Sequence, residues 1–311
     1  MSKAEVSSYK LEKSFFYRLR NRRRLAKFLG LAPSFFNTPT YKKEIIFYRT
    51  FYIIKRDGKK RIINNPGKTL KAIQKIILKY LSRIETPKWL ISGKRGKSYV
   101  DNGIFHKESY YVNTADIKTF YDNCKTNDVY KMFLNTFKMS PDLAGIMTDL
   151  VTDKGCLPTG SPVSQLIAYW TYNDIFKNVA DIASKNDTIF SLYVDDMTFS
   201  SNKSISKIML FEMGEQLKSV NLEVKKAKNK IYLKNQCKLI TGVAIDSNKI
   251  IRVPNKLRKA IIEDRKLLNN IVNVEEQKKK VRSLIGRIRS AQQIEPNIFN
   301  GIFNEVKSLS K

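Results

Sequence analysis

The sequence predicts a mixed α+β fold with antiparallel strands at its centre and helices at its C-terminal end. Two observations predict the strands. β-Forming residues flank the adjacent pair Asp195-Asp196 in residues 190–200, and a second β-rich run, residues 112–116, also ends in an aspartate. A third observation predicts the helices, because apolar residues recur at helical spacing through residues 257–306. The acidic pair is therefore expected at the tip of a β-hairpin.

The composition indicates a globular protein with a polyanionic partner. The chain has 311 residues, of which 42% are hydrophobic, enough for one large domain or a few subdomains around a real core. Its 58 basic and 28 acidic residues give a net charge of +30, far more than solubility requires. Basic residues recur along the whole chain with Phe and Tyr between them, which favours nucleic acid over a membrane. A basic protein without such a partner is the alternative.

The cysteines and the hydrophobic runs indicate a cytoplasmic location. Cys124, Cys156 and Cys237 are isolated, lack metal-ligand spacing and suit a reducing compartment. The N-terminus has no hydrophobic signal region, and no run reaches transmembrane length. We therefore expect no membrane partner.

The acidic pair suggests a metal site. Two neighbouring carboxylates at a tight turn repel each other, so either a divalent cation neutralises them or the turn is simply a solvated, Asp-rich one. The metal interpretation needs a further carboxylate, because two ions about 4 Å apart require more than two side chains. Asp116 is the candidate, and the carbonyl of Ile117 could also face a metal. The predicted ligands are thus Asp116, Ile117, Asp195 and Asp196.

Two basic segments precede these carboxylates. Residues 1–44 carry an arginine-rich stretch interleaved with apolar residues, which could face a phosphate backbone or be a solvated helix face. Residues 48–63 read as a hairpin turning at Asp57-Gly58 and loaded with basic residues, among them Lys55 and Arg61. Such a hairpin could fold over a triphosphate, or it could be an exposed turn rich in lysine.

Several motifs together resemble the reverse transcriptase family. Tyr-Val-Asp-Asp at 193–196 resembles the YxDD box, and the segment around Asp116 resembles the first catalytic box. Residues 157–165, Leu-Pro-Thr-Gly-Ser-Pro-Val-Ser-Gln, resemble the LPQG-x-P-x-SP box. Residues 102–106 resemble the NAxxH element of retron enzymes with Gly103 replacing Ala, and residues 239–243 resemble the VTG element with Ile240 replacing Val. The chain is thus similar to a retron-type reverse transcriptase.

This resemblance implies a right-hand polymerase fold with fingers, an antiparallel-sheet palm and an α-helical thumb. The expected parts are a basic helical extension (1–44), fingers (45–115), a palm (116–250, with finger helices inserted at about 126–155) and a thumb (251–311). From residue 252 onward there are 14 basic and 6 acidic residues, and 14 − 6 = 8 positive charges would suit a thumb that grips a duplex. A helical cap on the core is the alternative.

The resemblance also implies roles for particular residues. Lys55 and Arg61 match triphosphate contacts, and Tyr121 matches the steric gate against a ribose 2′-OH, with a core tyrosine as the alternative. Nucleotide contacts are also expected from Thr159, where the family usually has Gln, from Gly160, and from Lys228, which could instead bind a backbone. The retron-like elements place Asn102, His106, Thr241 and Gly242 in RNA recognition, with His106 structural or RNA-contacting but not a proton donor.

The implied reaction is RNA-directed DNA synthesis with two Mg²⁺ ions, for which Mn²⁺ could substitute. A primer hydroxyl attacks a dNTP, and the three aspartates, Asp116, Asp195 and Asp196, are the catalytic residues. A structured non-coding RNA would be both template and primer, starting from a guanosine 2′-OH and yielding branched RNA–DNA (msDNA) in antiphage defence. Host RNase H and an effector protein are the further partners. The alternatives are a reverse transcriptase of intron or other defence type, and a non-catalytic RNA-binding scaffold.

Overall fold

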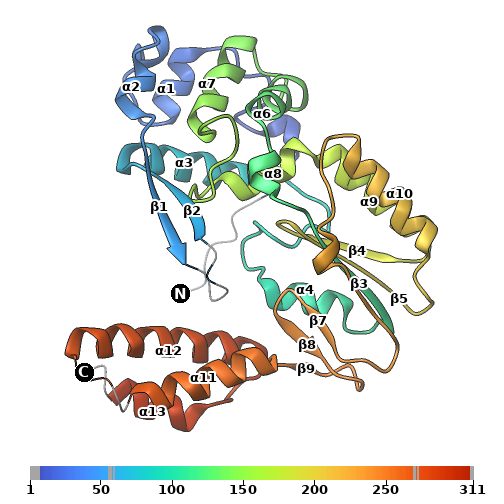
Figure 1. Cartoon of the computed structure of the whole chain (residues 1–311). Coiled ribbons are helices and arrows are strands. Elements are labelled where there is room, and N and C mark those ends of the chain that lie inside the picture. The colour runs from blue at the N-terminus through green and yellow to red at the C-terminus, as the bar shows by residue number, and fades with distance from the viewer. Residues whose placement is uncertain (1–7, 55–57, 59, 269–270, 272, 309–311) are drawn as a thin grey trace.

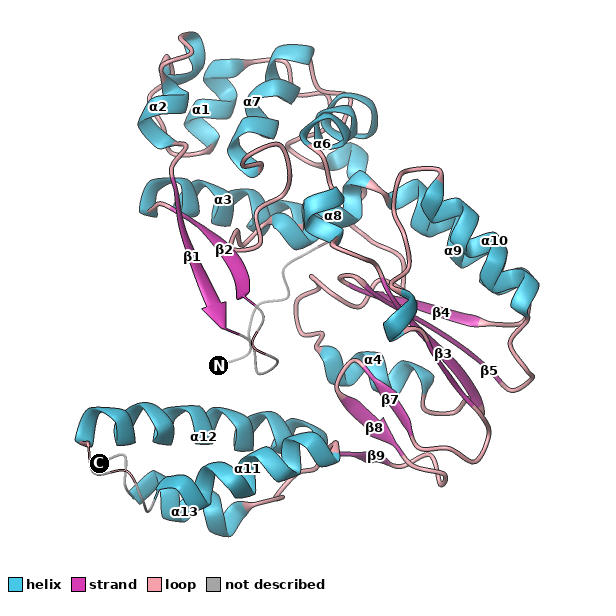
Figure 2. Cartoon of the chain, viewed as in Figure 1, coloured by secondary structure: helices cyan, strands magenta, loops and turns pink. Residues whose placement is uncertain are grey.

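The computed structural model of the 311-residue chain describes every residue except 1–7, 55–57, 59, 269–270, 272 and 309–311. The described residues form a mainly helical part with one long hairpin, a central part built on β-sheets, and three C-terminal helices (Figures 1 and 2). Helix and sheet are thus mixed, as the sequence predicts. Among these residues, no helix combines the length and the apolar character needed to cross a membrane.

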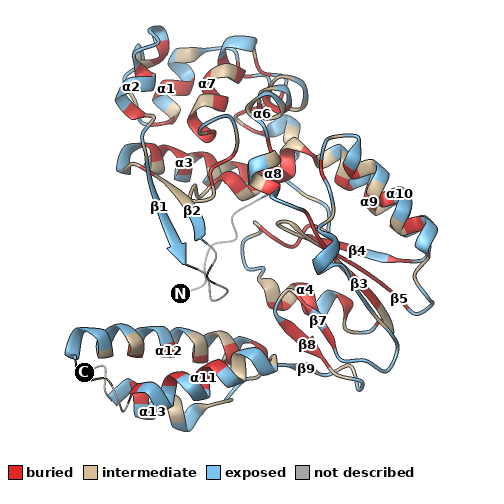
Figure 3. Ribbon diagram, in the orientation of Figure 1, coloured by how far each residue is buried: buried red, intermediate tan, exposed pale blue. Residues whose placement is uncertain are grey.

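The N-terminal part packs short helices above the hairpin β1–β2. Its elements are η1 (Leu11–Lys13), α1 (Arg22–Phe28), η2 (Phe35–Asn37), α2 (Tyr41–Ile45), β1 (Tyr48–Ile54), β2 (Lys60–Pro66), α3 (Lys68–Leu81), α6 (Thr126–Lys131), the π-helical η3 (Met132–Thr136) and α7 (Pro141–Val151). The helix α7 begins at Pro141, the position at which proline costs no hydrogen bond. The strands β1 and β2 are largely exposed, whereas α3 and α7 each bury an apolar face (Figure 3).

The central part is organised around an antiparallel sheet in the order β4-β5-β3-β6. Its elements are β3 (Tyr111–Asp116), α5 (Phe120–Asn123), α8 (Ser164–Thr171), α9 (Asn173–Lys185), β4 (Ile189–Tyr193), β5 (Asp196–Ser201), α10 (Lys207–Lys218), η4 (Lys226–Lys228) and β6 (Lys230–Tyr232). The strand β3 lies between β5 and β6, and five of the six residues of β5 are buried, the exception being Asp196. The helices α9 and α10 lie on one side of the sheet (Figure 1).

A second, smaller sheet and the helix α4 lie on the other side. The sheet has the order β7-β8-β9, with β7 (Lys238–Ile240), β8 (Val243–Ile245) and β9 (Ile251–Arg252). The helix α4 (Tyr99–His106) contacts both β4 and β8, so it lies between the two sheets (Figure 1). Its first turn is closed by a capping box between Ser98 and Asp101.

The C-terminal part consists of α11 (Asn255–Leu268), α12 (Val274–Ile294) and α13 (Asn300–Ser308). Asp264 on α11 is buried and forms ion pairs with two residues of α12, Lys280 at 2.8 Å and Arg287. The apolar core of this part includes Val100 of α4 and Val243 of β8. The three helices therefore share a core with the central part at one end. The domain boundaries at 44, 115 and 250 remain predictions.

Candidate active site

Three carboxylates meet at the tip of the β4–β5 hairpin and the adjacent end of β3. Asp196 begins β5 and stands opposite Asp116, the last residue of β3, while Asp195 occupies the turn. One carboxylate oxygen from each of the three residues lies within 4.8 Å of the other two. The sheet thus brings together the three aspartates that the sequence singled out, from segments far apart in the chain.

The turn that carries Asp195 has a strained main chain. Val194 has a φ of 60°, in the left-handed region that β-branched residues rarely adopt. The hydroxyl of Ser92 accepts a hydrogen bond of 2.9 Å from the Val194 N–H, which supports this conformation from outside the hairpin. Strain of this kind costs about 1–3 kcal/mol and persists where the surroundings enforce it, commonly at functional sites. In this turn the strained conformation places Asp195 beside Asp116 and Asp196.

The position of Asp116 follows from main-chain bonds on both sides of it. The N–H of Ile117 donates to the carbonyl of Asp195 at 2.9 Å, which ties β3 to the β4–β5 turn. The N–H of Lys225 donates to the carbonyl of Asp116 at 2.7 Å, which ties β3 to the segment before β6. The side chain of Ile117 is buried in the main core. Its carbonyl as a metal ligand remains a prediction.

The charges of the three carboxylates are poorly compensated. Burial raises the pKa of Asp196 to about 6, and the charges of Asp195 and Asp116 add to that rise. Burial also raises the pKa of Asp195, with Asp116 the next contributor. The Nζ atom of Lys228 lies 2.5 Å from Oδ2 of Asp116. Burial lowers the pKa of Lys228, but its hydrogen bond to Asp116 and the surrounding carboxylates raise it above the ordinary value.

These features fit divalent cations. Mg²⁺ and Mn²⁺ prefer oxygen ligands, and all three side chains offer carboxylate oxygens within one small volume. The raised pKa values of Asp195 and Asp196 show that their ionised forms are destabilised, which a bound cation would reverse. The alternative, a solvated acidic turn, does not fit, because Asp116 is buried and the other two are half-buried.

Besides Lys228, two of the predicted nucleotide contacts lie near this cluster, and another lies outside the described residues. Burial is the main cause of the raised pKa of both Asp195 and Tyr121. Arg61 on β2 is near enough that the positive charge of its guanidinium partly offsets the rise in both. Tyr121 is half-buried on α5, with its ring stacked on Phe120 at 6.0 Å between centroids. Lys55 is among the residues whose placement is not described.

Thr159 and Gly160 contact the protein's own hairpin. The hydroxyl of Thr159 donates to the carbonyl of Ile62 at 2.9 Å. A Cβ atom on Gly160 would lie 2.5 Å from the carbonyl oxygen of Asn64, so glycine is needed for the approach of β2. The segment therefore holds the base of the β1–β2 hairpin, which is a reason for Gly160 that the sequence did not indicate. A nucleotide contact by either residue remains a prediction.

Asn102 and His106 are both 0% exposed, which favours the structural alternative for His106 and leaves neither side chain at the surface for direct contact with RNA. Their part in RNA recognition remains a prediction. The Ser191 hydroxyl donates to Oδ1 of Asn102 at 2.7 Å and lies 2.7 Å from Nε2 of His106. The other ring nitrogen, Nδ1, lies 2.7 Å from the Ser200 hydroxyl. Asn102 Nδ2 donates to the hydroxyl of Thr241 at 2.5 Å. These residues form a buried polar network that joins α4 to β4, β5 and the β7–β8 turn.

Thr241 and Gly242 form the tight turn between β7 and β8. Both have positive φ, 47° and 89°, as a two-residue hairpin turn requires, which accounts for the glycine. Together with Asp116, Asp196 and Lys228 they line one cavity of about 390 Å³. The structure thus places the turn next to the carboxylates. A direct role of Thr241 and Gly242 in RNA recognition stays a prediction.

Sequence reasoning missed the residues that support the site. Ser92 lies far from the motifs and carried no signal. Ser191 did carry one, because it is a polar residue at a buried position of the otherwise apolar strand β4, whereas Ser200 lies in β5 among other polar residues. A buried hydroxyl in such a strand requires a hydrogen-bond partner, and the single histidine of the chain was an available candidate.

Comparison with known proteins places the chain among polymerases. Residues 53–284 match the family model described as reverse transcriptase (RNA-dependent DNA polymerase). The chain is 32% identical over 152 residues to the retron Se72 reverse transcriptase of Salmonella heidelberg, covering 49% of this chain and 40% of that relative. It is 24% identical over 256 residues to the retron Mx162 reverse transcriptase of Myxococcus xanthus, covering 72% of this chain and 53% of that relative. The chain thus spans about half the length, or less, of these curated relatives.

Among solved structures, the telomerase of Candida albicans in complex with a fragment of telomeric RNA has a similar fold. The TM-score is 0.53 at 10% identity, and the alignment covers 88% of this chain and 59% of that one. The family match and this likeness confirm the predicted right-hand polymerase fold. The relatives also confirm the predicted resemblance to retron enzymes.

Proposed function

The chain belongs to the reverse transcriptase family, and we propose that it synthesises DNA from dNTPs on an RNA template. One observation carries the proposal: the family's three motif carboxylates, Asp116, Asp195 and Asp196, are all present and lie together at a strained turn. Loss of a metal-binding carboxylate would have favoured a non-catalytic scaffold, and none is lost.

In this proposal the three aspartates and the Ile117 carbonyl hold two Mg²⁺ ions, with Mn²⁺ as a substitute. When bound, the ions lower the pKa of the attacking primer hydroxyl and neutralise the leaving oxygens. The protein orients the reactants, and no side chain must act as a general base. The one histidine, His106, is buried away from solvent with its pKa lowered by burial to about 3, so it does not take part in proton transfer.

Basic residues around the cluster are proposed to hold the phosphates. Arg61 lies on the hairpin near Asp195, and Lys55 is its predicted companion. Lys228, which pairs with Asp116, is the proposed cation that would donate to the pyrophosphate leaving group. Tyr121, close to Asp195, is the proposed steric gate that excludes a ribose 2′-OH. The cavity beside Thr241 and Gly242 is the proposed place for the end of the primer strand.

The subfamily implies a more specific role. Since the curated relatives are retron reverse transcriptases, we propose that the template and primer are one structured non-coding RNA. Synthesis would start at a guanosine 2′-OH and yield branched RNA–DNA, with a host RNase H trimming the template. An antiphage role with an effector protein is the corresponding biological proposal. Net charge of +30 supports a nucleic-acid partner, since many Lys and Arg contacts to phosphate release counterions.

The test compares matched Asp→Asn variants. Asp195→Asn and Asp196→Asn should abolish Mg²⁺-dependent dNTP incorporation, while RNA binding, which comes from dispersed basic residues, should persist and weaken steeply with salt. Asp187→Asn is the control, because Asp187 is an exposed residue beside β4 that pairs only weakly with Lys203 at 3.3 Å. Near-normal incorporation by either site variant would contradict the metal assignment. Sequencing the nucleic acid that co-purifies tests the retron proposal, for which branched RNA–DNA is the expected product.

A further inference from the structure

The helix α4 contacts the C-terminal helices at its first turn. The hydroxyl of Tyr99 donates to the main-chain carbonyl of Ser290 on α12 at 3.0 Å and lies 2.7 Å from the Ser290 hydroxyl. The next residue, Val100, is 8% exposed and belongs to the apolar core of α11–α13. The first turn of α4 is therefore part of the packing of the C-terminal helices.

The remaining part of α4 contacts the elements of the candidate active site. Asn102 and His106 bond to Ser191 on β4, and His106 also bonds to Ser200 on β5, the two strands that end at the catalytic turn. Asn102 also bonds to Thr241, which lines the same cavity as Asp116 and Asp196. One helix of eight residues thus contacts both the C-terminal helices and the catalytic hairpin.

The helix α4 approaches β8 closely at Gly103. A Cβ atom on Gly103 would lie 3.0 Å from two side-chain carbons of Val243, which is tighter than ordinary van der Waals contact. The glycine that replaces the alanine of the retron element is thereby explained, because it lets α4 approach β8 closely. Since α4 is capped by Ser98 and Asp101 and packed against β8, it should behave as a rigid body.

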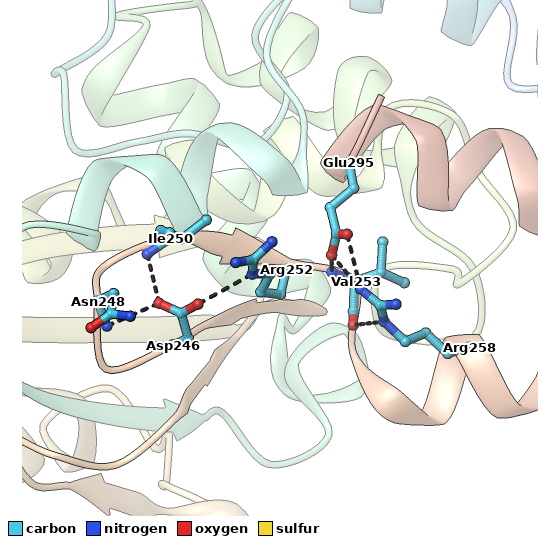
Figure 4. Close-up of polar contacts among 7 residues, drawn as sticks. All are labelled: Asp246, Asn248, Ile250, Arg252, Val253, Arg258 and Glu295. Carbon is cyan, nitrogen blue, oxygen red and sulfur yellow. Dashed lines mark hydrogen bonds and ion pairs between the residues drawn. The ribbon is translucent and has the colours of Figure 1, made fainter. Parts of the chain in front are cut away.

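A second set of contacts, made of hydrogen bonds and ion pairs, holds the loop that connects β9 to α11 (Figure 4). The carboxylate of Glu295, just after α12, accepts a 2.5 Å hydrogen bond from the Val253 N–H and pairs with Arg258 at 2.6 Å. Arg258 in turn donates to the Val253 carbonyl at 3.0 Å. In the turn between β8 and β9, the carboxylate of Asp246 accepts a hydrogen bond of 2.9 Å from the Ile250 N–H. The C-terminal helices are thus held in place both by the contacts of Glu295 in this loop and by the contact with Tyr99.

From these contacts we propose that α4 is a positioning helix, which sets the C-terminal helices and the catalytic turn in a fixed relation. Tyr99 is its positioning residue toward the helices, and Asn102 and His106 are its positioning residues toward the turn. The inference rests on the proposed function and on the prediction that the C-terminal helices grip the duplex, whose end must reach the carboxylates. A shift of about 1 Å in such a placement can cost on the order of a hundredfold in rate.

The test uses Tyr99→Phe, which removes one hydroxyl and leaves the ring in the core. Tyr9→Phe is the matched control, because the Tyr9 hydroxyl also donates to a main-chain carbonyl, that of Tyr80 at 2.8 Å, on a helix outside this path. The first readout is hydrogen exchange of the free protein, which needs no activity. Tyr99→Phe should speed exchange in α12 and also in β4–β5, whereas Tyr9→Phe should change neither.

The second readout is the rate of a single dNTP addition at saturating duplex and dNTP. Ser290→Ala, which loses one hydrogen bond to Tyr99, should lower this rate about fivefold, and Tyr99→Phe, which loses both contacts of the hydroxyl, should lower it at least as much. Ser290→Thr should keep the wild-type rate because it keeps the hydroxyl. Weaker duplex binding with an unchanged rate, or exchange that changes in α12 alone, would show that Tyr99 only tethers the helices and would overturn the proposal. If the wild-type chain added no dNTP, the proposed function would fail, while the exchange readout would still decide the coupling.

Discussion

The single histidine makes pH a specific probe of the buried network. His106 is the only histidine of the chain, its ring is 0% exposed, and both ring nitrogens lie 2.7 Å from serine hydroxyls. Burial lowers its pKa from 6.5 to about 3. We predict that replacement by Gln will remove part of the acid sensitivity of the protein's stability.

The sign and size follow from proton linkage. Below pH 6.5 the unfolded chain binds a proton at His106, whereas the folded chain does not until about pH 3. The stability conferred by the neutral ring is therefore complete above pH 6.5 and is lost as the pH falls. One pH unit corresponds to about 1.4 kcal/mol, so the loss at pH 5.0 is about 2 kcal/mol.

The assay is urea unfolding of the wild type and His106→Gln at pH 7.5 and 5.0 in EDTA. The raised pKa of Asp196 has the opposite effect, since protonation of that carboxyl favours the folded state, but it acts in both proteins and cancels in their difference. His106→Gln should be the less stable protein at pH 7.5, and the gap should shrink by about 2 kcal/mol at pH 5.0. An equal gap at both pH values would refute the buried, neutral ring.

Three further predictions concern other elements. Gly160→Ala should lower the free energy of unfolding by about 1–3 kcal/mol in urea, because its Cβ would lie 2.5 Å from a main-chain oxygen of β2, whereas Gly145→Ala, with open space at that position on a helix, should stabilise. Asp264→Asn should cost about 3 kcal/mol in a thermal melt, because it removes a buried charge that pairs with the half-buried Lys280 and Arg287, whereas Glu263→Gln at the exposed neighbouring position should cost almost nothing. Tyr121→Ala should raise ribonucleotide use relative to deoxyribonucleotide use in single-nucleotide addition, and unchanged sugar selectivity would mean that its ring is only packing.

Much of the fold was predictable because its signals are local. Alternating β-formers on both sides of Asp195-Asp196 require a hairpin, and Ser140-Pro141 marks a helix start wherever the helix packs. The position of Asp116 beside this hairpin has no such local signal, because the segment around Asp116 does not indicate which strand pairs with it. Asp116 was a candidate because it too ends a β-rich run, and the order of the motifs, which resembles that of a known family, supported the choice. Without that resemblance the sequence leaves a metal site and a solvated acidic turn as open alternatives.

The role of Asn102 and His106 could not be predicted from the motif, because a motif states which residues recur and not which way they point. A polar residue can be retained for a ligand or for a buried partner, and both give the same sequence pattern. The deciding information is the pair of serines on β4 and β5, which face α4 only after the sheet has formed. Thr159 illustrates the same point, since its hydroxyl bonds to the hairpin main chain at Ile62.

The buried network also explains why such polar residues can lie beside the turn that carries Asp195. An apolar contact between α4 and the β4–β5 hairpin would allow small sliding movements, because dispersion forces have little directional preference. Hydrogen bonds between His106 and both strands fix distance and direction at once, and an unsatisfied partner in this buried environment would be costly. Since Val194 at the tip of the same hairpin is held in a strained conformation, the hairpin needs support from outside itself. Ser92 provides this support at the tip and α4 provides it along the strands, so the arrangement of the three carboxylates depends on residues outside the acidic cluster.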